Sequence, residues 1–413
     1  IACHVSCCDT YINRHSDGFS RLFAHTPCIH ECTSAQAMLS PFSLLLYPRF
    51  PSSLPGPHTV GTVRSRLPKS TYVQVLYPCS DGGQRTNYFR EGAVDGLAEL
   101  AGMPKSIFRH LDKGPKKHPS RLEAPVRSHS NGGWPIMVFS HGTWGSSEMY
   151  TSLARSIASL GYVVVALEHE DGSACYATTS AGERVSHSLP YGTGRPDNEA
   201  FAHLLERRLS ELDGSLHALS LGGPRLDASL EAVLASCDRS RFVLAGHSFG
   251  AATCALAAER LASSFPLDCC LLFDLWAGVL PAAVKTGECA LPVLSVESET
   301  WSDYGWGMAN LRQMGRTEES LCLRAPGTAH QSFSDSSLWT PAFVARKTGA
   351  LGSRERRHAL HRACAIVADS FVRQAREPAT STVLEEVGEA ERDEEGADAN
   401  AVVNDDVCDS GSS

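Results

Sequence analysis

The sequence predicts an α/β fold whose central sheet is mostly parallel and is covered by helices on both faces. From about residue 71 onward, short apolar runs rich in β-branched residues alternate with segments of helical spacing, which is typical of this fold class. Several runs are apolar without interruption, as expected for strands that are buried on both faces. The strands are predicted at residues 72–76, 136–139, 162–167, 242–245, 270–273, 293–296 and 321–324.

Segments with helical spacing of apolar residues lie between these strands. The predicted helices cover residues 147–160, 196–219, 225–236, 249–263 and 355–375. In the last of these helices one apolar stripe should seal the sheet, and it consists of Leu360, Cys364, Val367 and Phe371.

Composition divides the chain into one folded domain and two flanking segments. With 413 residues, of which 42% are hydrophobic, the chain can bury a sizeable core. Residues 1–53 show no sustained periodicity and are interpreted as an irregular N-terminal extension. Residues 54–376 are interpreted as the folded domain. Residues 377–413 are acidic, lack aromatic residues and are predicted to be a disordered tail.

The net charge of −9 belongs to the tail rather than to the folded domain. Residues 377–413 hold 12 Asp and Glu against one Arg, which leaves the rest of the chain near +2. A mixed, weak field gives no preference for polyanionic partners, and no run of Lys or Arg indicates nucleic-acid binding.

The 15 cysteines are interpreted mainly as free buried thiols, because disulfide frameworks belong mainly to short secreted domains. Five of them lie in the first 32 residues together with His4 and His30, but the spacing lacks the paired C-x-x-C pattern of zinc sites. No metal is therefore predicted there. The compartment, cytoplasmic or secreted, stays open.

The strongest local signal for chemistry is the G-x-S-x-G pattern at residues 246–250, Gly-His-Ser-Phe-Gly. It follows a predicted strand and precedes an alanine-rich predicted helix, which is the context of a nucleophile elbow in α/β-hydrolases. Flanking glycines let the backbone pass closely, and the helix amino terminus favours developing negative charge. Ser248 is therefore the predicted nucleophile.

A serine needs a base and an orienting acid, which should follow it in the order Ser, acid, His. Asp274 directly follows the apolar strand at 270–273 and is the predicted acid, whereas Asp268 and Asp303 are interpreted as solvated loop acids. His330 follows the strand at 321–324 in a loop and is the predicted base. His358 and His361 lie in a helical pattern and are interpreted as surface residues.

Two backbone N–H groups should stabilise the oxyanion of the tetrahedral intermediate. One is predicted at Phe249, directly after the nucleophile, and the other at Thr143, in the loop after the strand at 136–139. The run Glu-His-Glu-Asp at 168–171 resembles a metal site superficially, but successive strand residues point to opposite faces. No metal is predicted, and no motif calls for a cofactor.

Several motifs together resemble the platelet-activating factor acetylhydrolases, both the plasma and the intracellular type II enzymes. The resemblance runs from about residue 54 to 375 and includes residues 57–61, Pro-His-Thr-Val-Gly. The motifs are Phe-Ser-His-Gly at 139–142, Glu-His-Glu-Asp-Gly-Ser-Ala at 168–174, Gly-His-Ser-Phe-Gly at 246–250, Phe-Asp-Leu-Trp at 273–276 and Gly-Thr-Ala-His-Gln-Ser-Phe at 327–333.

The resemblance implies an α/β-hydrolase catalytic domain that hydrolyses the sn-2 acetyl or short acyl ester of phospholipids without calcium, as a 1-alkyl-2-acetylglycerophosphocholine esterase. It also implies the same nucleophile, acid, base and oxyanion donors as above, and a substrate held in lipid or lipoprotein surfaces. One departure is Trp144, where the family usually carries glycine. A bulky ring there would be expected to reshape the acyl pocket.

Alternative functions remain open. A general carboxylesterase or lipase of the same fold would share the triad without the phospholipid preference, and a non-catalytic binding module would share only the fold. The segment 94–111, with apolar residues among charges, is interpreted either as an interfacial helix for peripheral membrane contact or as ordinary core packing. The oligomeric state is not indicated.

Overall fold

The structure is a computed structural model, and it describes residues 50–376 with internal gaps. The gaps are 69, 114–116, 130–131, 187–197, 222–225, 287–290, 304–319, 341–344, 346, 348–351 and 353–356. The predicted N-terminal extension up to residue 49, with its cysteine cluster, and the predicted tail at 377–413 lie outside the described residues.

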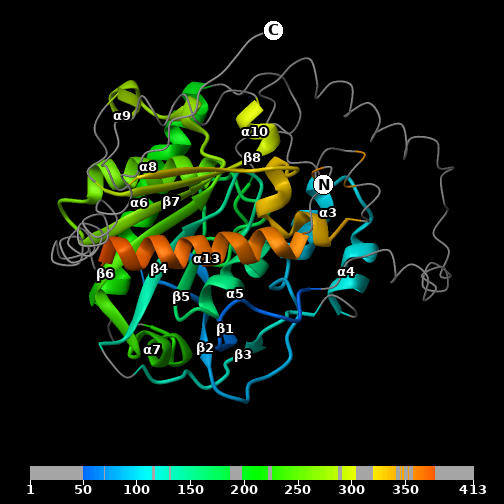
Figure 1. The fold of residues 1–413 in the computed structure, drawn as a ribbon. Coiled ribbons are helices and arrows are strands. Elements are labelled where there is room, and N and C mark those ends of the chain that lie inside the picture. Colours follow the sequence, from blue (N-terminus) through cyan, green and yellow to red (C-terminus); the bar gives the residue numbers. More distant parts are fainter. Residues whose placement is uncertain are drawn as a thin grey trace, which may run out of the picture.

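A nine-stranded, mostly parallel sheet forms the centre of the molecule (Figure 1). Its strand order is β3-β1-β2-β5-β4-β6-β7-β8-β9, and the neighbours from β5 to β9 pair in parallel. The strands are β1 (Thr59–Arg66), β2 (Tyr72–Cys79), β3 (Arg121–Leu122), β4 (Trp134–Ser140), β5 (Val163–Glu168), β6 (Cys237–His247), β7 (Leu267–Phe273), β8 (Val293–Ser298) and β9 (Leu321–Ala325). The predicted fold class is confirmed.

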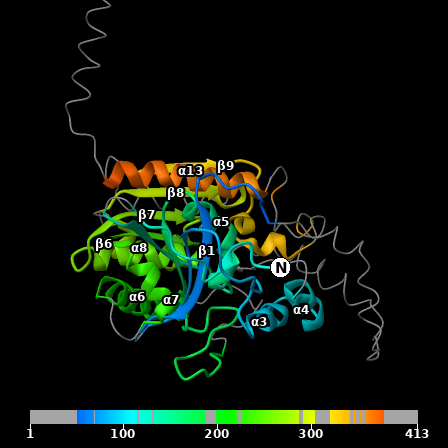
Figure 2. The ribbon, with the colours of Figure 1, turned by 90° about the horizontal axis from the view of Figure 1, so that it is seen from below.

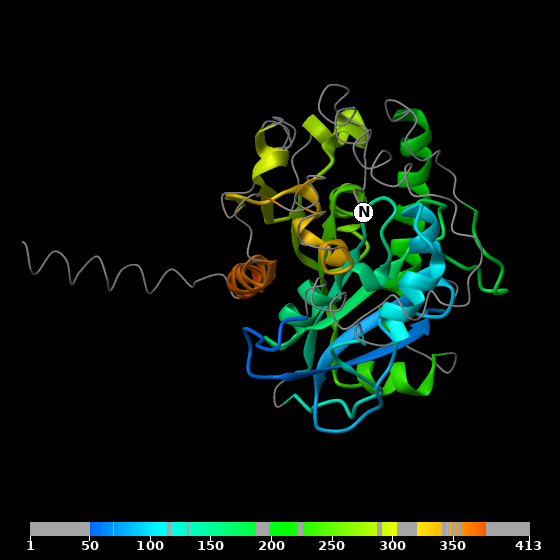
Figure 3. The same cartoon turned by 90° about the vertical axis from the view of Figure 1, so that its right-hand side faces the viewer.

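Helices cover both faces of the sheet, which is why the parallel strands are apolar on both sides. The helices are α3 (Ala93–Leu100), α4 (Lys105–Lys113), α5 (Thr151–Ala158), α6 (Asn198–Leu221), α7 (Ala228–Leu234), α8 (Phe249–Leu261), α9 (Ala282–Thr286), α10 (Glu299–Asp303) and α13 (Arg357–Arg376). Short 3₁₀ turns are η1 (Ser147–Tyr150), η2 (Ala277–Val279), η3 (His330–Phe333) and η4 (Asp335–Leu338). Figure 2 shows α13 on one side of the sheet and α6, α7 and α8 on the other, and Figure 3, which views α13 end-on, shows the same separation.

Two hydrophobic clusters form the core, one on each face of the sheet. Along β4, Ile136 and Val138 pack in the cluster that contains α6, α7 and α8, whereas Met137 and Phe139 pack in the cluster that contains α5 and α13. This alternation is the two-residue period of a strand. In α13, Cys364 and Phe371 are buried and Leu360 and Val367 pack against the same cluster, so the predicted apolar stripe does face the core.

All seven predicted strands correspond to observed ones, but β1 and β3 were not predicted. β1 pairs with β2 in antiparallel register, from Thr59 opposite Cys79 to Arg66 opposite Tyr72. Its sequence, TVGTVRSR, has no sustained apolar run. A strand near the sheet edge does not need one, because it is not covered on both faces along its whole length.

The interpretation of residues 94–111 as one interfacial helix is wrong. The segment forms two helices, α3 and α4, and Gly102 between them takes φ 60°. Leu97 and Phe108 are buried in the core, and Met103 and Ile107 pack against the same cluster. These apolar side chains therefore serve core packing, which was the alternative interpretation.

The eight cysteines in the described part of the chain are free, as expected, and six of them are buried. Among the same residues, no helix combines the length and apolar character needed to cross a membrane.

The order of the strands in the sheet determines where the predicted catalytic site lies. After β4 the chain turns to β5 on one side, and it returns to β6 on the other side of β4. At such a switch in strand order, the loops after adjacent strands diverge and leave a crevice at the carboxyl end of the sheet. The loop after β4 is predicted to carry one oxyanion donor, and the turn after β6 is predicted to carry the nucleophile and the other donor.

Candidate active site

Ser248 occupies a sharp turn between β6 and α8, with φ 58° and ψ −119°. L-residues rarely adopt this conformation, which costs on the order of 1–3 kcal/mol and persists only where surrounding structure holds it. The Ser248 N–H donates to the carbonyl of Phe273 at 2.9 Å, which ties the turn to the end of β7. The local geometry is that of a nucleophile elbow.

The two glycines of the elbow are required by close packing of the backbone. A Cβ at Gly246 would lie 2.3 Å from the carbonyl oxygen of Gly250, and a Cβ at Gly250 would lie 2.1 Å from the carbonyl oxygen of Ser140. No side chain could rotate away to relieve these contacts. The glycine spacing of the motif therefore follows from how β6, α8 and β4 meet.

We predict that Gly250→Ala destabilises the protein by about 1–3 kcal/mol, because the added methyl group forces backbone segments apart. Thermal unfolding measures the effect as a lowered Tm. The matched control is Gly182→Ala, where φ is 82° but a Cβ would meet nothing within 4 Å. A Tm loss for Gly250→Ala no larger than that of the control would contradict the packing argument.

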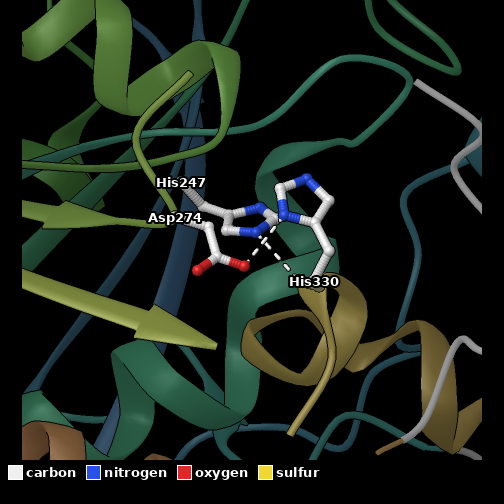
Figure 4. Close-up of side chains that lie close together, drawn as sticks. All are labelled: His247, Asp274 and His330. Carbon is white, nitrogen blue, oxygen red and sulfur yellow. Dashed lines mark hydrogen bonds and ion pairs between the residues drawn. The ribbon is translucent and has the colours of Figure 1, made fainter. Parts of the chain in front are cut away.

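The structure brings the three predicted triad residues together. His330 Nε2 lies 3.0 Å from Ser248 Oγ, and His330 Nδ1 lies 2.9 Å from Asp274 Oδ2. Asp274 follows β7 and His330 opens η3 after β9, so residues up to 82 positions apart converge at one edge of the sheet. Figure 4 shows Asp274 and His330 facing each other, with His247 beside them.

Ser298, at the end of β8, holds the carboxylate of Asp274. Its N–H donates to Oδ1 and its hydroxyl donates to Oδ2, both at 2.6 Å. Burial raises the pKa of Asp274 to about 7, although the nearby His247 and the Ser298 hydrogen bonds act to lower it. With its oxygens accepting from Ser298 and His330, the acid is oriented as an acceptor.

His330 is held as a neutral base. Burial lowers its pKa below the ordinary imidazole value, so the ring is unprotonated at neutral pH. Since Nδ1 faces the acid, it carries the proton and donates to Asp274, which leaves Nε2 to accept from Ser248. The indole of Trp301, from α10, stacks on this ring with centroids 4.2 Å apart and planes 15° apart. Sequence reasoning predicted neither Trp301 nor Ser298.

His247, inside the elbow motif, links the base to the loop after β4. Its Nε2 lies 3.0 Å from the carbonyl oxygen of His330 and must therefore donate to it. Burial and the nearby His330 lower the pKa of His247 to about 3, so its Nδ1 is an acceptor for the Tyr150 hydroxyl at 2.8 Å. The same hydroxyl oxygen accepts from the N–H of Gly142 at 3.0 Å.

The loop at residues 140–145, here called the oxyanion loop, lies against the elbow. A Cβ at Gly142 would be 3.2 Å from the Cβ of Ser248, so the loop backbone passes at contact distance from the predicted nucleophile. Thr143 follows directly in this loop, and Phe249 is the first residue of α8. Phe249 is thus adjacent to Ser248 in the chain, and the loop that carries Thr143 lies against Ser248 in space. The role of both residues as oxyanion donors stays a prediction.

Trp144, the departure from the resembled family, takes φ 56°. This left-handed region favours glycine, which gives a physical reason for glycine at that position. The Trp144 ring is buried and belongs to the core cluster that also contains Phe201, Phe249 and Trp276. The ring therefore packs into the core on the face of the sheet that carries α6, α7 and α8.

Two groups of side chains could suggest a metal. In the run at 168–171, the four side chains turn to different partners: Glu168 to Arg90, His169 to Glu211, Glu170 to Arg66 and Asp171 to Arg208. In the described residues, one atom each of His247, Asp274 and His330 come within 4.8 Å of one another. All four ring nitrogens of the two histidines already hydrogen-bond to protein groups, so an ion would have to displace the triad contacts.

Two interpretations of neighbouring residues are wrong. His361 is buried rather than exposed, and its Nε2 lies 2.9 Å from the carbonyl oxygen of Ser332. Asp268 lies on β7 rather than in a loop, and it is buried beside Arg241 and Arg376. Among the described residues, the hydrogen bonds and ion pairs of these two side chains go to partners other than the triad.

Comparisons with known proteins indicate the family. The family model described as "Platelet-activating factor acetylhydrolase, isoform II" matches residues 49–377. A platelet-activating factor acetylhydrolase of Canis lupus familiaris is 25% identical over 300 residues, which cover 67% of this chain and 65% of that protein. The match therefore spans slightly less than two thirds of that relative.

A putative phospholipase A2 of Schizosaccharomyces pombe is 32% identical over 266 residues, covering 52% of this chain and 58% of that protein. Among solved structures, a ferulic acid esterase from Streptomyces cinnamoneus matches with a TM-score of 0.55 at 19% identity, covering 80% of this chain and 94% of that one. At this identity the likeness supports the fold alone.

Proposed function

The chain belongs to the family of platelet-activating factor acetylhydrolase, isoform II, and we propose on that basis that it is a serine hydrolase of phospholipid esters. The single observation that carries the proposal is the hydrogen-bonded chain from Ser248 through His330 to Asp274, with contacts of 3.0 and 2.9 Å. A neutral imidazole between a hydroxyl and an acceptor acid is the arrangement that activates a serine.

In the proposed acylation step, Ser248 Oγ attacks the ester carbonyl carbon while its proton passes to His330 Nε2. The resulting imidazolium donates its Nδ1 proton to Asp274 in a hydrogen bond. Negative charge develops on the former carbonyl oxygen, where the N–H groups of Thr143 and Phe249 are the proposed donors.

The intermediate collapses when His330 returns the proton to the leaving alkoxide oxygen of the lysophospholipid, and the acyl group stays on Ser248. Water then attacks the acyl-enzyme with His330 as base, which releases the carboxylic acid and restores the serine. In this cycle His330 moves the proton and backbone N–H groups stabilise the oxyanion, so we propose that the reaction does not require calcium.

We propose more finely that the substrate is the sn-2 acetyl or short acyl ester of a phospholipid. Support comes from the family match over residues 49–377 and from relatives that bear the acetylhydrolase name. The phospholipid would be taken from a lipid or lipoprotein surface.

An acyl-chain series tests this proposal. On the purified chain, kcat/KM should be at least tenfold higher for an sn-2 acetyl phospholipid than for its sn-2 palmitoyl counterpart, because only a short chain suits an acetyl site. A calcium chelator should change neither value. Equal efficiency on phospholipids and a simple aryl acetate would favour a general carboxylesterase, and failure of an organophosphonate to label the folded protein would favour a binding module.

A further inference from the structure

A fully buried arginine lies behind the oxyanion loop. Arg208, in the middle of α6, has no exposed side-chain surface, although arginine is always charged at physiological pH. Buried cations are rare and need partners for both charge and hydrogen bonds. The groups to which this guanidinium donates therefore indicate which parts of the structure it holds in place.

The guanidinium joins two loops at the carboxyl end of the sheet, the one after β4 and the one after β5. Its Nε donates to Asp171 Oδ2 at 3.0 Å, and its Nη2 donates to Ser173 Oγ at 2.6 Å. Its Nη1 donates to the carbonyl oxygen of His141 in the oxyanion loop at 2.6 Å. Its Cζ lies 4.5 Å from the centre of the Phe249 ring, directly after the nucleophile.

These contacts fix the backbone on both sides of Thr143. Upstream, Arg208 holds the carbonyl of His141. Downstream, the N–H of Trp144 donates to the carbonyl of Ser173 at 2.5 Å, and the Ser173 hydroxyl is itself held by Arg208. The peptide that carries the Thr143 N–H is thus held on both sides, by the contact at the His141 carbonyl and by the contact at Ser173, and Arg208 takes part in both.

Charge compensation alone does not account for this arrangement. Burial acting alone would raise the pKa of Asp171, but Arg208 and the hydrogen bonds from Ser173 hold it below its ordinary value, so the pair is ionised. One donor of Arg208 suffices to balance that carboxylate. The other two go to the oxyanion loop and to the residue that anchors its far side.

We propose that Arg208 is a positioning residue for the oxyanion hole, holding the His141 carbonyl and the Asp171–Ser173 turn so that the Thr143 N–H faces the reacting carbonyl oxygen. The inference rests on the proposed function of the site. The proposal gives α6 a part in catalysis. The sequence of this helix does not indicate such a part, because it is amphipathic and lies far from the triad motifs in the chain.

The test compares the full chain with its Arg208→Lys variant on a soluble aryl acetate. Lysine keeps a positive charge beside Asp171, but a single ammonium does not reproduce the fixed fork that reaches all three partners. We expect kcat per active site to fall by roughly 10- to 100-fold, approaching the loss of one oxyanion donor, while KM changes by less than about twofold. Inhibition by a trifluoromethyl ketone, whose adduct on Ser248 carries an oxyanion, should weaken by the same factor.

Arg260→Lys is the matched control. Arg260 is an exposed residue of α8. It binds Glu206, which lies on α6 as Arg208 does, at 2.7 Å, but it does not contact the oxyanion loop. Its kcat should stay unchanged. The final extent of organophosphonate labelling counts competent sites in every sample, so that a partly unfolded variant is not mistaken for a slow one.

Each outcome bears on the inference. Unchanged kcat per labelled site in Arg208→Lys, whatever its Tm, would overturn it, and so would an equal loss in Arg260→Lys. If Arg208→Lys does not fold, the double variant Asp171→Asn/Arg208→Gln removes both buried charges and should show the same kcat loss. A wild-type protein that is not labelled at all would instead refute the proposed function.

Discussion

Replacing Ser248 by alanine should lower kcat by roughly 10⁵- to 10⁶-fold, because the variant loses the atom that attacks the ester and the covalent intermediate with it. The substitution keeps the Cβ, so the elbow conformation at φ 58° is no more strained than before. Binding of the substrate should persist, since the proposed oxyanion donors and the surrounding core are untouched.

Active-site labelling checks this expectation together with the rate. A fluorescent organophosphonate should mark the wild-type chain once and should not mark Ser248→Ala. Ser240→Ala serves as control, because Ser240 lies on the same strand β6 but is exposed, and its hydroxyl donates to Asp238. Stoichiometric labelling of folded Ser248→Ala would mean that another residue is the nucleophile.

The elbow could be predicted from sequence because its determinants are local. A strand, a glycine-flanked serine and a helix follow one another within residues 237–261, and the backbone contacts of Gly246 and Gly250 impose the spacing. Asp274 and His330 could be predicted because each follows an apolar strand in the expected order, and parallel strands end at the same edge.

The residues that orient the triad leave no such local pattern. Ser298 holds Asp274 across 24 positions, and Tyr150 binds His247 across 97 positions, so each partner is defined only by the fold. His247 lies within the elbow motif, but its function in linking His330 to Tyr150 follows only from where the fold places its ring. Trp301 follows β8 without any motif of its own.

The same limit explains the errors. The apolar residues of α3 and α4 are spaced as on an amphipathic helix, but a spacing pattern does not say whether the apolar side meets lipid or core. His361 lies on a helix whose buried side was predicted from Leu360 and Cys364, and a histidine on that side was assigned to the surface by residue type alone. Burial overrides residue type wherever a backbone carbonyl, here that of Ser332, supplies a partner.

Replacing Asp274 by asparagine should lower kcat by about 10⁴-fold at neutral pH, even though the side chain keeps its shape. The argument lies in the donors that surround it. The Ser298 N–H donates to Oδ1 and cannot donate to an amide nitrogen, so the carbonyl oxygen of the new amide must take the position of Oδ1. The amide nitrogen then faces His330 and donates to its Nδ1.

That inversion gives His330 the wrong tautomer. With Nδ1 accepting, the ring proton moves to Nε2, and the nitrogen that faces Ser248 at 3.0 Å is no longer able to take the serine proton. KM should change little, because the acid does not contact the substrate. The hydroxyl of Ser298 is free to rotate and accept from the amide, so the variant should fold.

Asp268→Asn on the same strand is the matched control, since this acid bonds to Arg241 and Arg376 at the other end of β7 and should leave kcat unchanged in the folded protein. Ser298→Ala separates orientation from tautomer: it removes one donor to Asp274 but leaves the carboxylate facing His330, so its loss in kcat should be far smaller than 10⁴-fold. If Asp274→Asn retained more than about a tenth of wild-type kcat, the imidazole would not depend on this acid for its tautomer, and the catalytic chain would end at His330.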